Sequence, residues 1–179
     1  EVRRKYLALG HGRWSGPATR TVDAPIGRDA RNRLRMAVVD LALQPGKPAM
    51  TTFELLQGTE RACLVQASLH TGRTHQIRVH MAHLGHPLVG DLLYGGQAQG
   101  IGRQALHATR LAFTHPVTGE PIDLRSPPPP DLQAALAAWG LDYNPAPASA
   151  PGAQPPAPRS PRPPAAARDA STSRTGPPE

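Results

Sequence analysis

Cysteine is almost absent from this sequence, and long apolar runs are absent altogether. Cys63 is the single cysteine among 179 residues, so the chain can form neither a disulfide framework nor a zinc site built from several cysteines. Its neighbours Ala62, Leu64 and Val65 are apolar, which favours a core thiol over a reactive one. No run approaches membrane-spanning length and no secretory signal is visible. We therefore expect a cytoplasmic protein without a membrane partner.

Lysine is also scarce, although the chain is strongly basic. Lys5 and Lys47 are the only lysines, so arginine supplies nearly all of the 20 basic residues that oppose 13 acidic ones, and the formal charge is +7. Arginine can fork onto a phosphate or stack on a base, so this balance favours a polyanionic partner such as RNA. The alternative is a basic surface that serves only solubility.

Large apolar side chains are missing from the last part of the chain. Residues 144–179 contain no aromatic residue and no aliphatic residue larger than alanine. Such a segment cannot bury enough apolar surface to offset its ordering entropy, which predicts a domain over residues 1–143 followed by a disordered tail. An RNA-binding arm is the alternative, because four arginines are spaced through the tail: Arg159, Arg162, Arg168 and Arg174. Asp169 and Glu179 offset part of that charge, which favours a passive extension.

The spacing of apolar residues predicts a mixed α/β domain of the α+β class with a largely antiparallel sheet. The expected strands are 4–9, 36–39, 51–56, 61–69, 106–114 and 121–125, and the expected helices are 74–84 and 131–139. The second to fourth of these strands are expected to form a meander, and residues 16–28, rich in turn residues, to run over the surface. Thr74 is the expected N-cap of the first helix.

The segment 69–81 contains the most informative motif. A strand brings the chain to Gly72 and a helix follows within two residues, so backbone N–H groups and the side chains of Arg73 and Arg78 should converge as an anion site. Because Arg78 lies one turn into the helix, the two arginines can do different work. One can hold a phosphate while the other faces a buried carboxylate.

At this point the sequence resembles a known family, the RluA-type RNA pseudouridine synthases, and in particular the members that modify large-subunit ribosomal RNA. The string GRTHQIRVHMAHLGHPLVGDLLYGG, residues 72–96, is similar to the family's signature through that region. Further matching segments lie at 4–8, 24–28, 46–51, 104–108 and 115–116, in the family's order. The resemblance therefore covers nearly everything from Arg4 to about Leu136.

The resemblance implies an isomerase that detaches uracil from C1′, rotates it and rejoins it through C5, without cofactor or metal. Tyr6 then resembles the tyrosine that stacks on the target base and helps remove the C5 proton. Arg78 resembles the cation that pairs with the nucleophilic aspartate, and Leu106 the aliphatic residue that packs against the flipped nucleotide. The residues expected to contact RNA around them are Arg73, Thr74, His75 and Gln76. The partner that the resemblance implies is structured RNA, in particular large-subunit ribosomal RNA, bound by a monomer, with no DNA partner.

One feature departs from the family pattern. The family's aspartate lies in an HRLD-like motif upstream of the tyrosine, whereas only five residues precede Tyr6 and no such motif occurs in the chain. We therefore expect that the start at Glu1, within a strand pattern, is a cut, and that the chain lacks its nucleophile and is inactive alone. The alternatives are a non-catalytic RNA-binding remnant, or Asp91 as a substitute nucleophile.

Plainer interpretations of the same residues stay open. Without the resemblance, Tyr6 would be a half-buried strand residue, Arg78 a helix-surface cation and Leu106 a core residue. A metal-dependent hydrolase is a third hypothesis, because four histidines cluster in the sequence: His75, His80, His83 and His86. Zinc sites usually add cysteine or a carboxylate, and Asp91 is the only such residue nearby, which makes this hypothesis the weakest.

Overall fold

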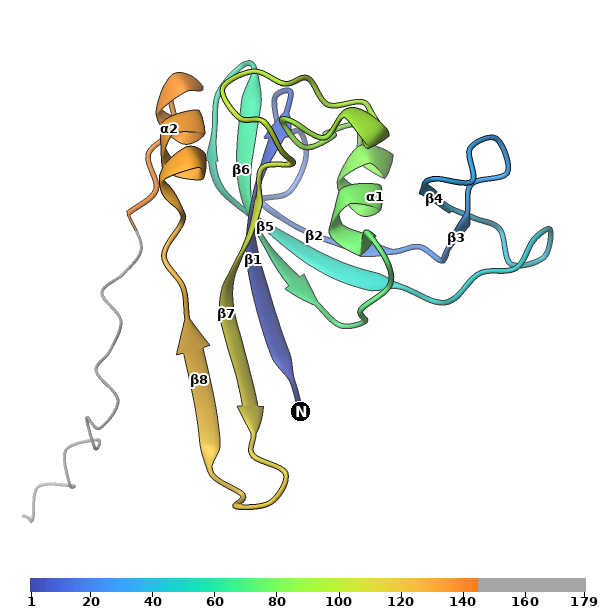
Figure 1. The fold of residues 1–179 in the computed structure, drawn as a ribbon. Helices are drawn as coiled ribbons and strands as arrows, with labels where there is room; N and C mark the ends of the chain where they lie inside the picture. Colours follow the sequence, from blue (N-terminus) through green and yellow to red (C-terminus); the bar gives the residue numbers. More distant parts are fainter. Residues whose placement is uncertain (145–179) are drawn as a thin grey trace, which may run out of the picture. The chain divides into compact units, whose positions relative to one another are not determined.

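The computed structural model describes residues 1–144, which form an antiparallel sheet with one helix on each face (Figure 1). The six strands follow the order β2-β5-β6-β1-β7-β8, and every neighbouring pair is antiparallel. Their bounds are β1 Arg3–His11, β2 Thr19–Asp23, β5 Met50–Gly58, β6 Ala62–Leu69, β7 Leu106–Thr114 and β8 Pro121–Arg125. The other elements are β3 Ile26–Arg28, β4 Met36–Val38, α1 Gln76–His83, the 3₁₀ turn η1 Leu92–Tyr94 and α2 Pro130–Ala138. This confirms the α+β prediction.

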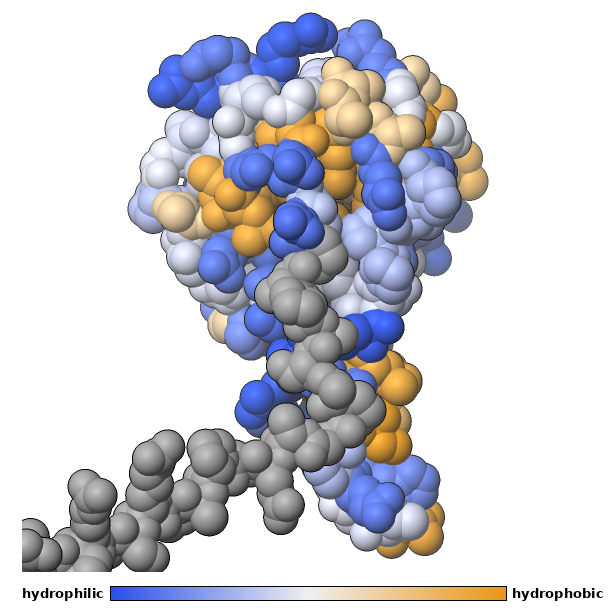
Figure 2. Space-filling view, turned by 90° about the vertical axis from the view of Figure 1, so that its left-hand side faces the viewer, coloured by the Kyte–Doolittle hydropathy of each residue, from blue (hydrophilic) through white to orange (hydrophobic). Residues whose placement is uncertain are grey.

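The two faces of the sheet follow from strand alternation on the central strand β1. Leu7 and Leu9 belong to the buried cluster that includes α2, whereas Tyr6 and Ala8 belong to the cluster that includes α1. β1 lies between β6 and β7 in the sheet, and a buried cluster lies on each of its faces. The middle of the sheet is therefore covered on both sides. The β7–β8 hairpin projects from the rest, and apolar side chains are visible on it at the bottom of Figure 2.

The structure corrects two sequence predictions in the first third of the chain. Residues 16–28 do not simply run over the surface, because β2 forms an edge strand paired with β5 and β3 pairs with β4. The predicted meander is also wrong: β4 leaves the main sheet and forms a separate two-stranded sheet with β3. Gly27 permits this arrangement, since a Cβ atom there would collide with the carbonyl oxygen of Pro45.

Cys63 lies fully buried in the core, as its apolar neighbours predicted. Burial raises the pKa of its thiol to about 12, so the reactive thiolate is disfavoured. Among the described residues, no helix is both long and apolar enough to cross a membrane. The predicted tail, apart from Asn144, lies outside the described residues.

His80 links α1 to the sheet through a buried polar network. Its Nε2 bonds to the carbonyl oxygen of Ala24 at 2.9 Å, so this nitrogen carries the hydrogen, and its Nδ1 lies 2.9 Å from Thr51 Oγ1. The same hydroxyl accepts a hydrogen bond from Gln76 Nε2 at 2.9 Å. A second proton on His80 would leave the Thr51 hydroxyl without an acceptor. Burial accordingly lowers the pKa of His80 below its usual 6.5.

This network predicts a stability that falls in mild acid. The folded state binds a proton on His80 less readily than the unfolded chain, so stability decreases as pH falls below about 6.5, by up to about 1.4 kcal/mol per pH unit. Thermal melts at pH 7.5 and 5.5 should show a smaller pH-dependent loss for His80→Gln than for the unaltered chain. The exposed His83→Gln is the control and should keep the full loss. An equal loss in all three proteins would contradict the assignment.

Candidate active site

Tyr6 and Leu106 lie on the sheet face that α1 covers. In the antiparallel pairing of β1 and β7, Tyr6 is opposite Ala108 and Ala8 is opposite Leu106. Opposite residues share a face, so Tyr6 and Leu106 are diagonal neighbours, close enough for an aromatic side chain to reach across. Both are partly buried and pack against the cluster beneath α1. The structure therefore brings together these two residues, which the resemblance selected.

A β-bulge lies directly beside Tyr6. The register of β1 and β7 shifts between Lys5 and Tyr6, which leaves Thr109 as the extra residue of β7. The Thr109 hydroxyl donates a hydrogen bond to the Lys5 carbonyl oxygen at 3.2 Å. Bulges bend a strand and redirect the side chains next to them, and they are common beside active sites.

The first helix begins differently from the prediction, because Thr74 does not cap it. His75 is the N-cap, in the left-handed region with φ of 56°, and makes no side-chain capping bond. Gln76 organises the turn instead. Its Oε1 accepts hydrogen bonds from the Arg73 N–H at 2.9 Å and the Thr71 hydroxyl at 2.7 Å, and its Nε2 donates to the Met50 carbonyl oxygen at 3.0 Å. With only 3% of its surface exposed, Gln76 faces the interior rather than the solvent.

Arg78 forms a bidentate ion pair with Asp91. Arg78 Nε donates to Asp91 Oδ2 and Arg78 Nη2 donates to Asp91 Oδ1, each at 2.8 Å. The side chains are 14% and 1% exposed, so this ion pair is largely desolvated. The hydrogen bonding to Asp91 raises the pKa of Arg78. A guanidinium has five N–H donors, and the two bonds to Asp91 are its only side-chain hydrogen bonds within residues 1–144, so three donors stay free.

Tyr94, which the sequence did not single out, connects Arg78 to its surroundings. The Arg78 guanidinium lies over the Tyr94 ring, 4.9 Å from its centroid. The Tyr94 hydroxyl accepts the Met36 N–H at 2.9 Å and lies 2.8 Å from His75 Nδ1. Burial raises the pKa of Tyr94, and burial together with nearby Arg78 lowers the pKa of His75. At neutral pH, a neutral imidazole is therefore held against the Tyr94 hydroxyl.

The predicted convergence of Arg73 with Arg78 is only partly present. Arg73 Nε donates to the carbonyl oxygen of Pro48 at 2.8 Å, whereas Arg78 is committed to Asp91, so no common partner joins them. Thr74 is exposed at the start of the helix, with no side-chain bond in the described part of the chain. The roles predicted for these residues toward RNA stay predictions.

Arg4 is a second cation that the sequence did not single out. It lies two residues before Tyr6, hence on the same face of β1, and its guanidinium packs against the backbone of Gly72. A Cβ atom at Gly72 would lie 2.6 Å from Arg4 Nη1. The Nε atom of Arg4 is buried without a hydrogen-bond partner in the region that the structure describes. A cation held this way adds to the positive potential near Tyr6.

The histidines do not form a metal centre in residues 1–144, where no group of three or more potential ligands is close enough to hold an ion. Both ring nitrogens of His80 are used by protein groups, and His86 Nδ1 bonds to the carbonyl oxygen of His11 at 2.8 Å. The geometry therefore gives no support to the metal-dependent hydrolase.

Comparison with known proteins shows which proteins the chain resembles. Residues 1–83 match the model of a family described as RNA pseudouridylate synthase. An uncharacterized RNA pseudouridine synthase of Chloroflexus aurantiacus is 48% identical over 137 residues, which cover 75% of this chain and 42% of the relative. Ribosomal large subunit pseudouridine synthase D of Xanthomonas campestris pv. campestris is 45% identical over 156 residues, which cover 79% of this chain and 45% of the relative. The structure of human RNA pseudouridylate synthase domain containing 1 superposes with a TM-score of 0.62 at 33% identity. The match covers 73% of this chain and 57% of the human one.

The sheet and these matches show that the chain is similar to RNA pseudouridine synthase domains. Within that class, the resemblance to the RluA-type family that the segment 72–96 indicated is confirmed over the matched part of the chain. It spans less than half the length of the two bacterial relatives.

The ion pair predicts a large and non-additive loss of stability. Asp91→Ala should destabilise the chain by about 3–5 kcal/mol, because it leaves the Arg78 charge buried and unpaired. Arg78→Met combined with Asp91→Ala should cost clearly less than the sum of the two single changes. Urea unfolding of the unaltered chain, the two single variants and the double variant gives the free energies of this double-mutant cycle. The exposed Arg13–Glu60 pair is the control, and its coupling energy in the same cycle should be below about 1 kcal/mol. Additive losses at Arg78 and Asp91 would contradict the account.

Proposed function

We propose that this chain supplies the base-binding part of an enzyme that converts uridine to pseudouridine in RNA. One observation carries the proposal: Tyr6 and Leu106 are diagonal neighbours on the sheet face covered by α1, and α1 holds a largely buried arginine with free donors. An aromatic ring, an aliphatic side chain and a fixed cation are what a flipped uracil and an anionic nucleophile require.

The base would lie between Tyr6 and Leu106. Tyr6 is part-buried at the edge of the apolar cluster, so its ring can stack on a uracil while its hydroxyl takes part in removal of the C5 proton. Leu106 closes the other side of the base. The cost of extruding the nucleotide is offset by these contacts and by the basic residues around the site.

Arg78 would hold the nucleophilic carboxylate. Asp91 occupies two of its donors and fixes the guanidinium, and the other three are available to a second carboxylate, which they would keep ionised. The 179 residues contain no HRLD-like segment, and the carboxylate of Asp91 is already bonded to Arg78. We therefore place the nucleophile outside residues 1–179 and give Asp91 a positioning role.

Large-subunit ribosomal RNA is the substrate that we propose. A relative 45% identical to this chain is named ribosomal large subunit pseudouridine synthase D, and the chain carries a formal charge of +7. Arg73, Thr74 and His75 border the site and are proposed to contact this RNA. Gln76 would act indirectly, because its amide holds the turn that places them.

A chimera tests the proposal without assuming anything about residues before Glu1. Residues 1–144 replace the matching part of the Xanthomonas relative, and tritium release from C5-labelled uridine is followed in a large-subunit ribosomal RNA transcript. We expect the chimera to release tritium and the 179-residue chain alone to release none. Tyr6→Phe keeps the stacking ring but should lower kcat by about 100-fold or more, with a smaller change in KM.

Arg110→Gln provides the matched control, since this partly exposed arginine pairs with Asp123 on the projecting hairpin. It should leave the rate of the chimera unchanged, whereas Arg78→Gln should abolish turnover. Release by the chain alone would place the nucleophile within these residues and make Asp91 its first candidate. A well-folded chimera without activity would contradict the proposal.

A non-catalytic RNA-binding protein is the second candidate. The observation that favours it is the absence of an HRLD-like segment from a chain whose Arg78 already has a carboxylate partner. An inactive chimera that still binds the transcript with the affinity of the Xanthomonas protein would support this candidate over the isomerase.

A further inference from the structure

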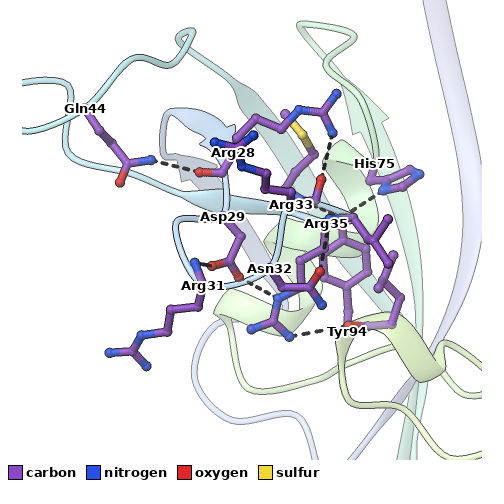
Figure 3. Close-up of polar contacts among 12 residues, drawn as sticks. Arg28, Asp29, Arg31, Asn32, Arg33, Arg35, Gln44, His75 and Tyr94 are labelled. Carbon is purple, nitrogen blue, oxygen red and sulfur yellow. Dashed lines mark hydrogen bonds and ion pairs between the residues drawn. The ribbon is translucent and has the colours of Figure 1, made fainter.

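The hairpin formed by β3 and β4, residues 26–38, concentrates positive charge beside the site. It contains four arginines and one aspartate, which leaves a formal charge of +3. The pairing of β3 with β4 places its loop, residues 29–35, at one end of the small sheet. Figure 3 shows polar contacts of this hairpin together with Gln44, His75 and Tyr94.

The loop is held in one shape by its own polar groups. Asp29 bonds to the Arg35 guanidinium and also accepts the Arg31 N–H at 2.8 Å. These contacts lower the pKa of Asp29, with the Arg31 N–H as the largest cause. Asn32 Oδ1 accepts the Leu34 N–H at 3.0 Å. The loop is therefore preorganised, and ordering it would cost little on binding.

Three of the four arginines are left for a ligand. Arg28, Arg31 and Arg33 are exposed, and none of them forms an ion pair within residues 1–144, whereas Arg35 is used by Asp29. The only side-chain bond among them is a long one, 3.4 Å from Arg28 Nη1 to the Arg33 carbonyl oxygen. Leu34 lies between them and is 79% exposed. The hairpin thus carries three guanidinium groups that have no carboxylate partner within residues 1–144.

The hairpin is attached to the candidate active site rather than separate from it. Arg35 Nη1 donates to the Leu93 carbonyl oxygen at 3.5 Å, and the Met36 N–H donates to the Tyr94 hydroxyl at 2.9 Å. The same hydroxyl contacts His75, as Figure 3 shows. Ile26 and Val79 of α1 belong to one buried cluster that includes Tyr94. A ligand bound to the hairpin would therefore lie at a fixed position relative to Arg78.

We propose that this hairpin is a phosphate-binding surface for the RNA strand next to the target nucleotide, with Arg31 and Arg33 as its principal contacts. The inference rests on the proposed function and adds where the backbone of the substrate is held. Guanidinium groups bind phosphodiester oxygens in bidentate fashion, and a rigid spacing between them fixes the register of the strand. A single exposed leucine is too little apolar surface for a stable protein interface, which favours RNA over a protein partner.

Anisotropy titrations of a fluorescein-labelled, uridine-containing RNA stem-loop with the 179-residue chain test this inference. Arg31→Gln combined with Arg33→Gln should weaken binding at least about tenfold at 100 mM salt and lower the salt slope by about 1.5, since two phosphate contacts are lost. The pair Arg31→Lys and Arg33→Lys should recover part of the affinity, because lysine keeps the charge but loses the bidentate hydrogen bonding. Neither change touches the Asp29–Arg35 contact.

The matched control is Arg110→Gln combined with Arg125→Gln, which removes equal charge from two arginines that pair with Asp123. It should change affinity less than about threefold. An equal loss in the control, an unchanged affinity in the glutamine pair, or no recovery with lysine would each overturn the inference. Turnover by the chimera is measured separately. An inactive chimera whose hairpin arginines still determine RNA affinity would therefore count against the proposed function alone.

Discussion

The ion pair between Arg78 and Asp91 fixes the cation of the site, because it bonds the guanidinium on α1 to the loop that follows the helix. Removing two charges from water is costly, and a bidentate geometry at 2.8 Å compensates that cost only when both partners are held rigidly. The Tyr94 ring below the guanidinium and the buried face of α1 provide this rigidity. The same arrangement leaves three N–H donors in a poorly solvated place, where an anion is attracted more strongly than in water.

Tyr94 connects the Arg78–Asp91 ion pair to the β3–β4 hairpin. Its ring faces Arg78, while its hydroxyl is shared by His75 and the backbone of Met36. The arginine-bearing hairpin is therefore bonded to the loop that pairs with Arg78, and the phosphate contacts proposed for the hairpin and the chemistry proposed for Tyr6 would belong to one recognition surface.

Local patterns predicted much of the fold, because they depend on residues close in sequence. The predicted strands 106–114 and 121–125 match β7 and β8, and α1 lies within the predicted helix 74–84. The edge strand β2 was missed because Val22 is its only buried residue and turn residues surround it. Arg78 faces a buried carboxylate, as one of the two arginines was expected to do, but its partner Asp91 and the role of Tyr94 were missed, since both depend on how a glycine-rich loop folds back under α1. The left-handed backbone of His75 explains why Thr74 did not act as the cap.

The most direct test of the central claim is a crystal structure of residues 1–144 bound to an RNA stem-loop with a uridine in its loop. The account predicts a uracil ring between Tyr6 and Leu106, Asp91 still paired with Arg78, and the free donors of Arg78 facing the nucleotide. RNA bound on the α2 face, or an Arg78 that leaves Asp91 to contact phosphate directly, would contradict it.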